Sequence, residues 1–91
     1  MLEVIQKKQF VKSLKRYKHN KPVLIELEKV VKLLINNKPI PKQYRDHALK
    51  GGFKGVRECH LQPDTLLLYF VIEDDILKLI DIGSHSNALK M

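Results

Sequence analysis

Residues 56–83 read VRECHLQPDTLLLYFVIEDDILKLIDIG, and this stretch decides the fold. Three segments in it are rich in leucine, β-branched and aromatic residues: 56–61, 66–72 and 76–82. The separators between them contain Pro, Asp and Glu, which favour turns. Because connections this short join antiparallel neighbours, the stretch predicts a three-stranded meander. Its middle strand is apolar on both faces and is expected to be buried.

Two helical patterns precede this predicted sheet. The first spans residues 7–18 and has lysines on most of one face and apolar residues on the other, namely Phe10, Val11, Leu14 and Tyr17. The second follows Asn20, a favourable helix cap, and Pro22, and its apolar residues recur every three or four positions until Asn36 and Asn37. Residues 2–5 form a short apolar run suited to a first strand, at an edge or at the centre of the sheet.

The expected fold class is therefore α+β, in the order β-α-α-β-β-β. Two amino-terminal helices would pack on a small, mostly antiparallel four-stranded sheet. Residues 38–55 are rich in Pro and Gly and predict a long loop with one helical turn, a length at which loops are often functional. Residues 84–91 form a brief tail, helical or frayed. A chain of 91 residues supports one hydrophobic core, so we expect a single domain over residues 1–91.

The net charge of +7 is distributed unequally along the chain. Residues 1–45 hold twelve basic and three acidic side chains, whereas residues 46–91 hold five and seven. A cationic surface favours polyanions, because each neutralised phosphate releases counterions. The alternative is a solvated lysine face that aids solubility.

Cysteine usage and hydropathy indicate a cytoplasmic protein. Cys59 is the only cysteine and cannot form an internal disulfide, so nothing suggests an oxidising compartment. The amino terminus lacks the apolar stretch of a signal peptide, and no run of about 18 apolar residues exists to span a membrane. We therefore expect no membrane partner.

Histidines in the second half are the candidate catalytic residues. His47, His60 and His85 each lie in a loop or at the edge of a predicted strand, whereas His19 lies in an exposed linker without an expected role. In a meander the first and third strands run in the same direction, so one rim of the sheet would hold His60, Asp64 and His85. Each histidine taken alone is more simply a hydrogen-bonding loop residue.

These residue types suit the cleavage of RNA without a metal. The reaction needs a base for the 2′-hydroxyl proton, an acid for the departing 5′-oxygen and cations for the phosphate, and histidine serves both proton transfers near neutral pH. Lys50, Lys54 and Arg57 are candidate phosphate ligands. No cofactor or metal is expected, because paired CxxC or HxxxH units are missing from the sequence and Cys59 should point away from His60.

Four motifs in order resemble one known family: DHALKG at 46–51, KGVRECH at 54–60, PD at 63–64 and GSHS at 83–86. The pattern is similar to the YafQ branch of the RelE superfamily over nearly the full chain. The resemblance implies a RelE-like fold and a type II toxin that cuts mRNA, typically on the ribosome, and is silenced by an antitoxin protein. It places the catalytic residues at His47, His60, His85 and Asp64.

Two positions depart from that family pattern. Asp81 stands where the family often has an arginine, and Leu89 stands where it often has an aromatic residue. The first change removes a phosphate-binding cation, and the second removes a ring on which a base stacks. Together with the basic first half, they motivate an alternative to the leading endoribonuclease hypothesis, namely a noncatalytic module that binds RNA or an acidic protein and uses its histidines structurally.

Overall fold

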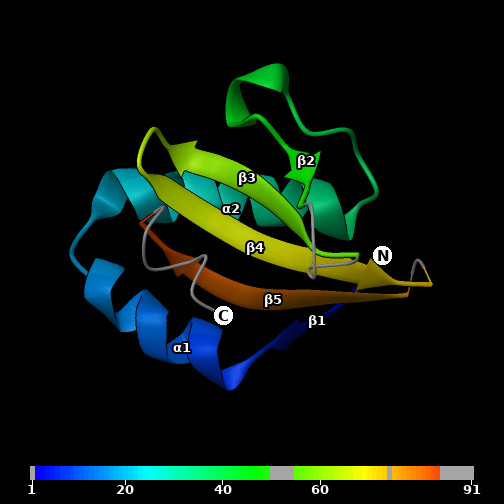
Figure 1. Cartoon of the computed structure of the whole chain (residues 1–91), viewed down its shortest axis with the longest axis horizontal. Helices are drawn as coiled ribbons and strands as arrows, with labels where there is room; N and C mark the ends of the chain where they lie inside the picture. The colour runs from blue at the N-terminus through cyan, green and yellow to red at the C-terminus, as the bar shows by residue number, and fades with distance from the viewer. Residues whose placement is uncertain (1, 50–54, 74, 85–91) are drawn as a thin grey trace.

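The computed structural model describes residues 2–49, 55–73 and 75–84, which form a mixed sheet and two α-helices (Figure 1). The helices are α1 (Lys8–Leu14) and α2 (Lys21–Ile35), and the 3₁₀ turns are η1 (Lys15–Tyr17) and η2 (Lys42–Tyr44). The strands are β1 (Glu3–Gln6), β2 (His47–Ala48), β3 (Arg57–Gln62), β4 (Thr65–Ile72) and β5 (Ile76–Gly83). The α+β class is confirmed.

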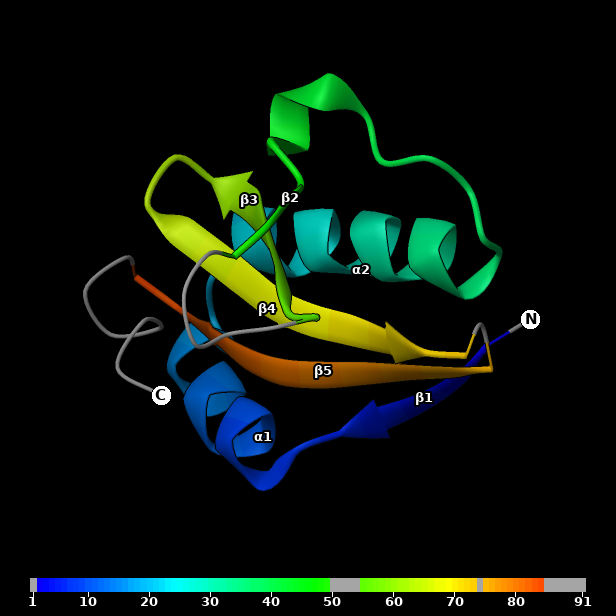
Figure 2. The same cartoon turned by 45° about the vertical axis from the view of Figure 1, so that its right-hand side comes forward.

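The sheet has the order β1-β5-β4-β3-β2 (Figure 2). The predicted antiparallel meander is confirmed as β3, β4 and β5, and β4 lies in its centre. The first strand lies at one edge and pairs with β5 in parallel, with Glu3 opposite Ile76. The prediction of four strands was wrong, because β2 is a fifth strand at the other edge, inside the expected loop. Two residues carry no alternation of polarity, so β2 has no signature in the sequence.

Both predicted helices are present, but only α2 has the predicted length. The Asn20 side chain accepts a hydrogen bond from the Val23 backbone N–H at 3.3 Å, which caps α2 as predicted. The first helix is shorter than predicted, since it ends at Leu14 and continues as η1. Val11 was placed on the apolar face but is 42% exposed, because it lies about 100° around the helix from the buried Phe10.

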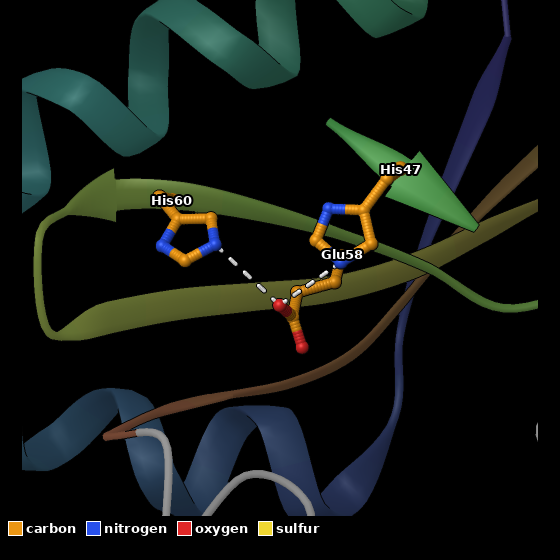
Figure 3. A group of neighbouring side chains, drawn as sticks. All are labelled: His47, Glu58 and His60. Carbon is orange, nitrogen blue, oxygen red and sulfur yellow. Dashed lines mark ion pairs between the residues drawn. The ribbon is translucent and has the colours of Figure 1, made fainter. Parts of the chain in front are cut away.

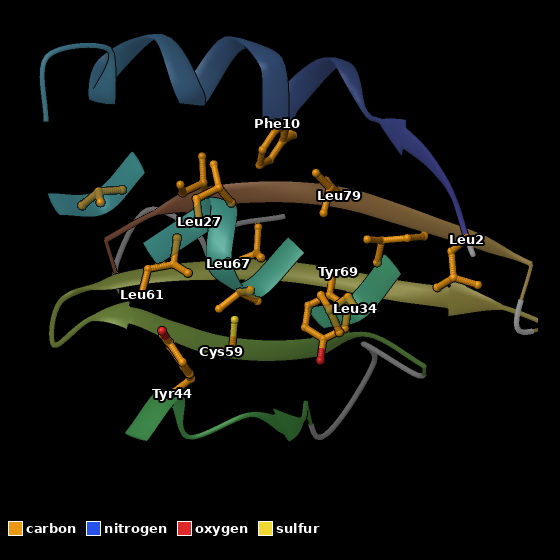
Figure 4. Packing of buried hydrophobic residues seen from close by; sticks show 14 residues of the cluster. Leu2, Phe10, Leu27, Leu34, Tyr44, Cys59, Leu61, Leu67, Tyr69 and Leu79 are labelled. Carbon is orange, nitrogen blue, oxygen red and sulfur yellow. The ribbon is translucent and has the colours of Figure 1, made fainter. Parts of the chain in front are cut away.

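The main hydrophobic core lies between both helices and one face of the sheet (Figure 4). Helix residues such as Phe10 and Leu27 pack there with alternate residues of the sheet, including Cys59, Leu67 and Tyr69. A smaller apolar cluster around Leu66 and Leu68 lies on the opposite face. Glu58 and His60 of β3 share that opposite face, because they alternate with the core residue Cys59. In the described part of the chain, no helix is long and apolar enough to cross a membrane.

Candidate active site

Pairing of β2 with β3 brings together side chains that are distant in the sequence. The antiparallel register sets His47 opposite Glu58, and His60 follows Glu58 two residues along β3. Because strand side chains alternate between faces, Glu58 and His60 share one face while Cys59 lies in the core on the other. His47, Glu58 and His60 therefore converge on the face that the helices leave open (Figure 3).

One carboxylate oxygen contacts both imidazole rings of this cluster. Glu58 Oε1 lies 3.3 Å from His47 Nε2 and 3.5 Å from His60 Nε2. The two ring centroids are 6.1 Å apart. The Glu58 side chain is only 3% exposed and that of His60 13%, whereas half of His47 is accessible. The arrangement therefore has a buried acid, a mostly buried imidazole and an imidazole that a ligand can reach.

Both ring nitrogens of His47 make polar contacts. Its Nδ1 lies 2.6 Å from the backbone oxygen of Arg45, which can only accept, so Nδ1 carries a proton. A favourable contact of Nε2 with the Glu58 carboxylate requires a second proton. Both contacts are hydrogen bonds when the ring carries a proton on each nitrogen. The other oxygen, Glu58 Oε2, is buried without a hydrogen-bond partner among the described residues, an arrangement that costs free energy until a proton or ligand satisfies it.

A second cluster of polar side chains links the residue before β2 to strands β3 and β4. Asp46 accepts hydrogen bonds from Arg57, at 3.3 Å from Nε and 3.0 Å from Nη2, and the Tyr69 hydroxyl also donates to it. The hydrogen bond to Asp46 raises the pKa of the Arg57 guanidinium. Burial, followed by the hydrogen bond to Asp46, raises the pKa of the Tyr69 hydroxyl, so this group remains a donor. Since Asp46 immediately precedes His47, these contacts fix the backbone that presents the imidazole.

The other predicted site residues lie elsewhere or outside the description. Asp64 is exposed in the turn between β3 and β4, at the rim of the sheet where β3 and β5 both end, with β4 between them. Arg57 is engaged by Asp46 and does not join the histidine cluster. Lys50, Lys54 and His85 lie outside the described residues, as does Leu89. Of the predicted set, the structure thus brings together His47 and His60.

Asp81, one of the two positions noted above as departures from the family pattern, is 6% exposed in β5. It lies opposite Leu68, which on its other side lies opposite Glu58, so the two acidic residues belong to one row across the sheet. The Asp81 carboxylate accepts a hydrogen bond from the Ile82 backbone N–H at 2.8 Å. Its contact is therefore with its own strand.

Sequence reasoning missed Glu58, Asp46 and Tyr69. The sequence could have predicted Glu58, because an acidic residue two positions before a histidine in the same strand lies on the same face of the sheet as that histidine. Asp46 and Tyr69 are 23 residues apart, and only the packing of the loop against the sheet joins them.

The histidine cluster also fits a metal ion. His47, Glu58 and His60 each offer one ligand atom, and these atoms lie within 4.8 Å of one another. Two imidazoles and one carboxylate form a donor set that suits zinc or copper. The sequence contains no CxxC or HxxxH pair that marks this group, because its members come from two paired strands.

Comparisons with known proteins identify the class. A family model described as a bacterial toxin of a type II toxin–antitoxin system, YafQ, matches residues 2–90. A YafQ relative from Haemophilus influenzae is 43% identical over 96 residues, which cover 98% of this chain and 94% of that protein. The mRNA interferase toxin YafQ of Escherichia coli K12 is 35% identical over 79 residues, covering 86% and 85%.

Solved structures agree with this match. A copper-bound mutant toxin from Helicobacter pylori has a TM-score of 0.86 at 41% identity and covers 94% of this chain and 97% of that one. The Escherichia coli DinJ–YafQ complex gives 0.85 at 32% identity over 100% of both chains. The matches define the class, a bacterial toxin of a type II toxin–antitoxin system. Within this class, the chain belongs to the YafQ family, which confirms the resemblance noted in its motifs.

Proposed function

We propose that this toxin is an endoribonuclease that cleaves mRNA, with His47, Glu58 and His60 at the centre of the reaction. The observation that carries the proposal is the pair of imidazoles against one buried carboxylate oxygen, at 3.3 and 3.5 Å. The substrate is supported by the Escherichia coli relative, which is described as an mRNA interferase. The basic first half of the chain supplies attraction for RNA phosphates.

The chemistry is transfer of the phosphoryl group within the RNA strand. The 2′-oxygen attacks the adjacent phosphorus, the bond to the 5′-oxygen breaks, and the products are a 2′,3′-cyclic phosphate and a 5′-hydroxyl end. His60 takes the 2′-hydroxyl proton, and the accessible His47, in its protonated form, gives its Nε2 proton to the departing oxygen. Glu58 orients both rings and balances their charge. No step requires a metal ion.

The remaining predicted residues keep roles in this proposal. His85 is a third proton-transfer group, and Asp64 assists from the rim of the sheet. Lys50 and Lys54 hold the phosphate. Arg57 positions the loop through Asp46, which engages Nε and Nη2, and its Nη1 donors would also bind the substrate phosphate.

The partners follow from the class and from the relatives. An antitoxin protein would bind and silence the toxin, in line with the Escherichia coli DinJ–YafQ complex. We further propose that the chain acts in the cytoplasm and meets its mRNA on the ribosome, where translated codons are presented singly.

Inducing the chain in bacteria tests the activity. Wild type should arrest growth and leave mapped cuts in mRNA, whereas His47→Ala and His60→Ala should each reduce cutting by about 10²-fold or more. His19→Ala is the matched control, because His19 is exposed and remote from the cluster in sequence and role. Equal cutting by wild type and both cluster variants would exclude this site. Salt-sensitive RNA binding without cutting, on naked RNA and on ribosomes alike, would instead establish the noncatalytic module.

A second candidate property is metal binding by the same three residues. Their ligand atoms lie within 4.8 Å of one another, and related Helicobacter pylori toxins have been solved in copper-bound and metal-bound forms. Calorimetric titration with Zn²⁺ or Cu²⁺ should show one site that His47→Ala weakens. His19→Ala should leave the affinity unchanged, and an unaltered affinity in His47→Ala would place the ion elsewhere.

A further inference from the structure

A polar pocket of about 290 Å³ opens beside His60. It lies between α2, η2 and the hairpin that joins β3 to β4. Its polar lining consists of Glu26, Gln43, Tyr44, Arg45 and Gln62, together with His60 of the candidate active site. His60 therefore borders both this pocket and the candidate active site.

Two local features of the backbone create the pocket. Within the described chain, β2 covers β3 only at Arg57 and Glu58, because the chain adopts a left-handed conformation at Arg45, with φ of 48°. The edge of β3 beyond Glu58 is thus left without a strand partner on that side. The pairing of β3 with β4 also shifts register between His60 and Gln62. Such irregularities redirect side chains and are frequent next to active sites.

The pocket is lined by the carboxylate of Glu26, which a hydrogen bond holds in place, and by the side-chain amides of Gln43 and Gln62. Glu26 Oε1 accepts a hydrogen bond from the Tyr44 hydroxyl at 2.7 Å, and Oε2 lies 3.7 Å from the exposed Lys29 ammonium. A carboxylate has about four acceptor positions, so Glu26 retains capacity for N–H donors of a ligand. Gln43 and Gln62 each supply both a donor and an acceptor. Tyr44 is buried and holds the carboxylate in place.

We propose that this pocket receives the base next to the scissile phosphate and that it favours guanine. Guanine presents two neighbouring N–H groups, at N1 and N2, which match the two oxygens of a carboxylate. Its O6 and N7 acceptors match the glutamine amides. Uracil presents a single N–H between two carbonyl oxygens, which a carboxylate repels. The inference rests on the proposed nuclease function and adds to it the choice of base.

Cut-site mapping in vivo tests the choice of base. Wild type should cut next to guanine more often than next to other bases, and Glu26→Gln should reduce this ratio by about tenfold, the scale of one bidentate base contact. Glutamine keeps the acceptor for Tyr44 and removes the charge. Glu28→Gln is the matched control, since it makes the same change on the same helix at an exposed residue outside the pocket. An unchanged ratio in Glu26→Gln and Gln62→Leu, with cutting intact, would overturn the pocket and leave the nuclease standing.

A binding experiment keeps the test independent of cleavage. Titrating the labelled protein with guanosine, adenosine, cytidine and uridine monophosphates should shift the NMR amide signals of Gln43 and Gln62 most with the guanosine nucleotide. Glu26→Gln should lose that preference, while Glu28→Gln retains it. Equal shifts with all four nucleotides, or none at the pocket, would refute a guanine site even if wild type proved unable to cut RNA.

Discussion

Replacing Tyr69 with phenylalanine isolates the group that fastens β2 to the sheet. The substitution removes only the hydroxyl that donates to Asp46 and keeps the buried ring, which is 2% exposed. Hydrogen bonds to charged groups contribute about 1.5–3 kcal/mol. Because the Asp46 side chain is 17% exposed, water can take over part of this bond. We therefore expect Tyr69→Phe to lower the free energy of unfolding by about 1–2 kcal/mol.

Urea denaturation measures this loss, and hydrogen exchange locates it. For a domain of this size, 1–2 kcal/mol corresponds to a decrease of roughly 5–15 °C in Tm. Backbone amides of His47 and Ala48 should exchange faster, while those of α2 follow only the change in global stability. Cutting of mRNA should also fall, since Asp46 precedes His47 and sets its backbone.

Tyr17→Phe is the matched control, because the Tyr17 hydroxyl makes no hydrogen bond to another described residue. It should change the free energy of unfolding by less than about 0.5 kcal/mol. A loss that small in Tyr69→Phe as well, together with unaltered exchange at β2, would show that the Asp46 contacts do not hold the strand.

Three further predictions address the core, a helix cap and the histidine cluster. Burial raises the pKa of the Cys59 thiol from 9.0 to about 12. Above pH 9 the unfolded thiol therefore loses its proton before the folded one, so stability should fall as pH rises, by about 1.4 kcal/mol per pH unit up to about pH 12. Cys59→Val should flatten a plot of unfolding free energy against pH in this window, and an equal slope in both proteins would contradict the assignment. Asn20→Ala removes the acceptor for the Val23 N–H and should cost about 1 kcal/mol in thermal unfolding, whereas Asn36→Ala, which caps no N–H of α2 with its side chain, should cost less. Saturating Zn²⁺ should inhibit RNA cutting by occupying the imidazole lone pairs of His47 and His60, and EDTA should restore it; loss of cutting in EDTA would instead make the metal part of the reaction.

Local chemistry in the sequence was sufficient for most of the elements. The Pro63–Asp64 turn joins β3 to β4, and both strands carry enough apolar residues to be recognised individually. Asn20 and the recurring apolar residues of α2 predicted that helix to within about a turn at each end. These features depend on residues that are close together in the sequence, so they can be predicted without the tertiary structure.

The sequence did not predict how segments that are distant in the chain pair with one another. Nothing in residues 2–5 specifies a parallel pairing with β5, which lies more than 70 residues further along the chain. His47 and Ala48 form strand β2 only because they pair with Glu58 and Arg57 of β3. Contacts of this kind depend on which hydrophobic faces pack against one another. The register of such pairings is determined by the packing of the complete core and not by any one segment.

The candidate site shows the same division. Residue types alone pointed to His47 and His60 as proton-transfer groups, and the order of motifs pointed to the toxin family. Tertiary structure alone set Glu58 between the two imidazoles and Asp46 against Arg57 and Tyr69. The physical reason is that the chemistry of a side chain belongs to the residue, whereas its distance to a partner 11 or more residues away depends on how the strands pair and which faces become buried.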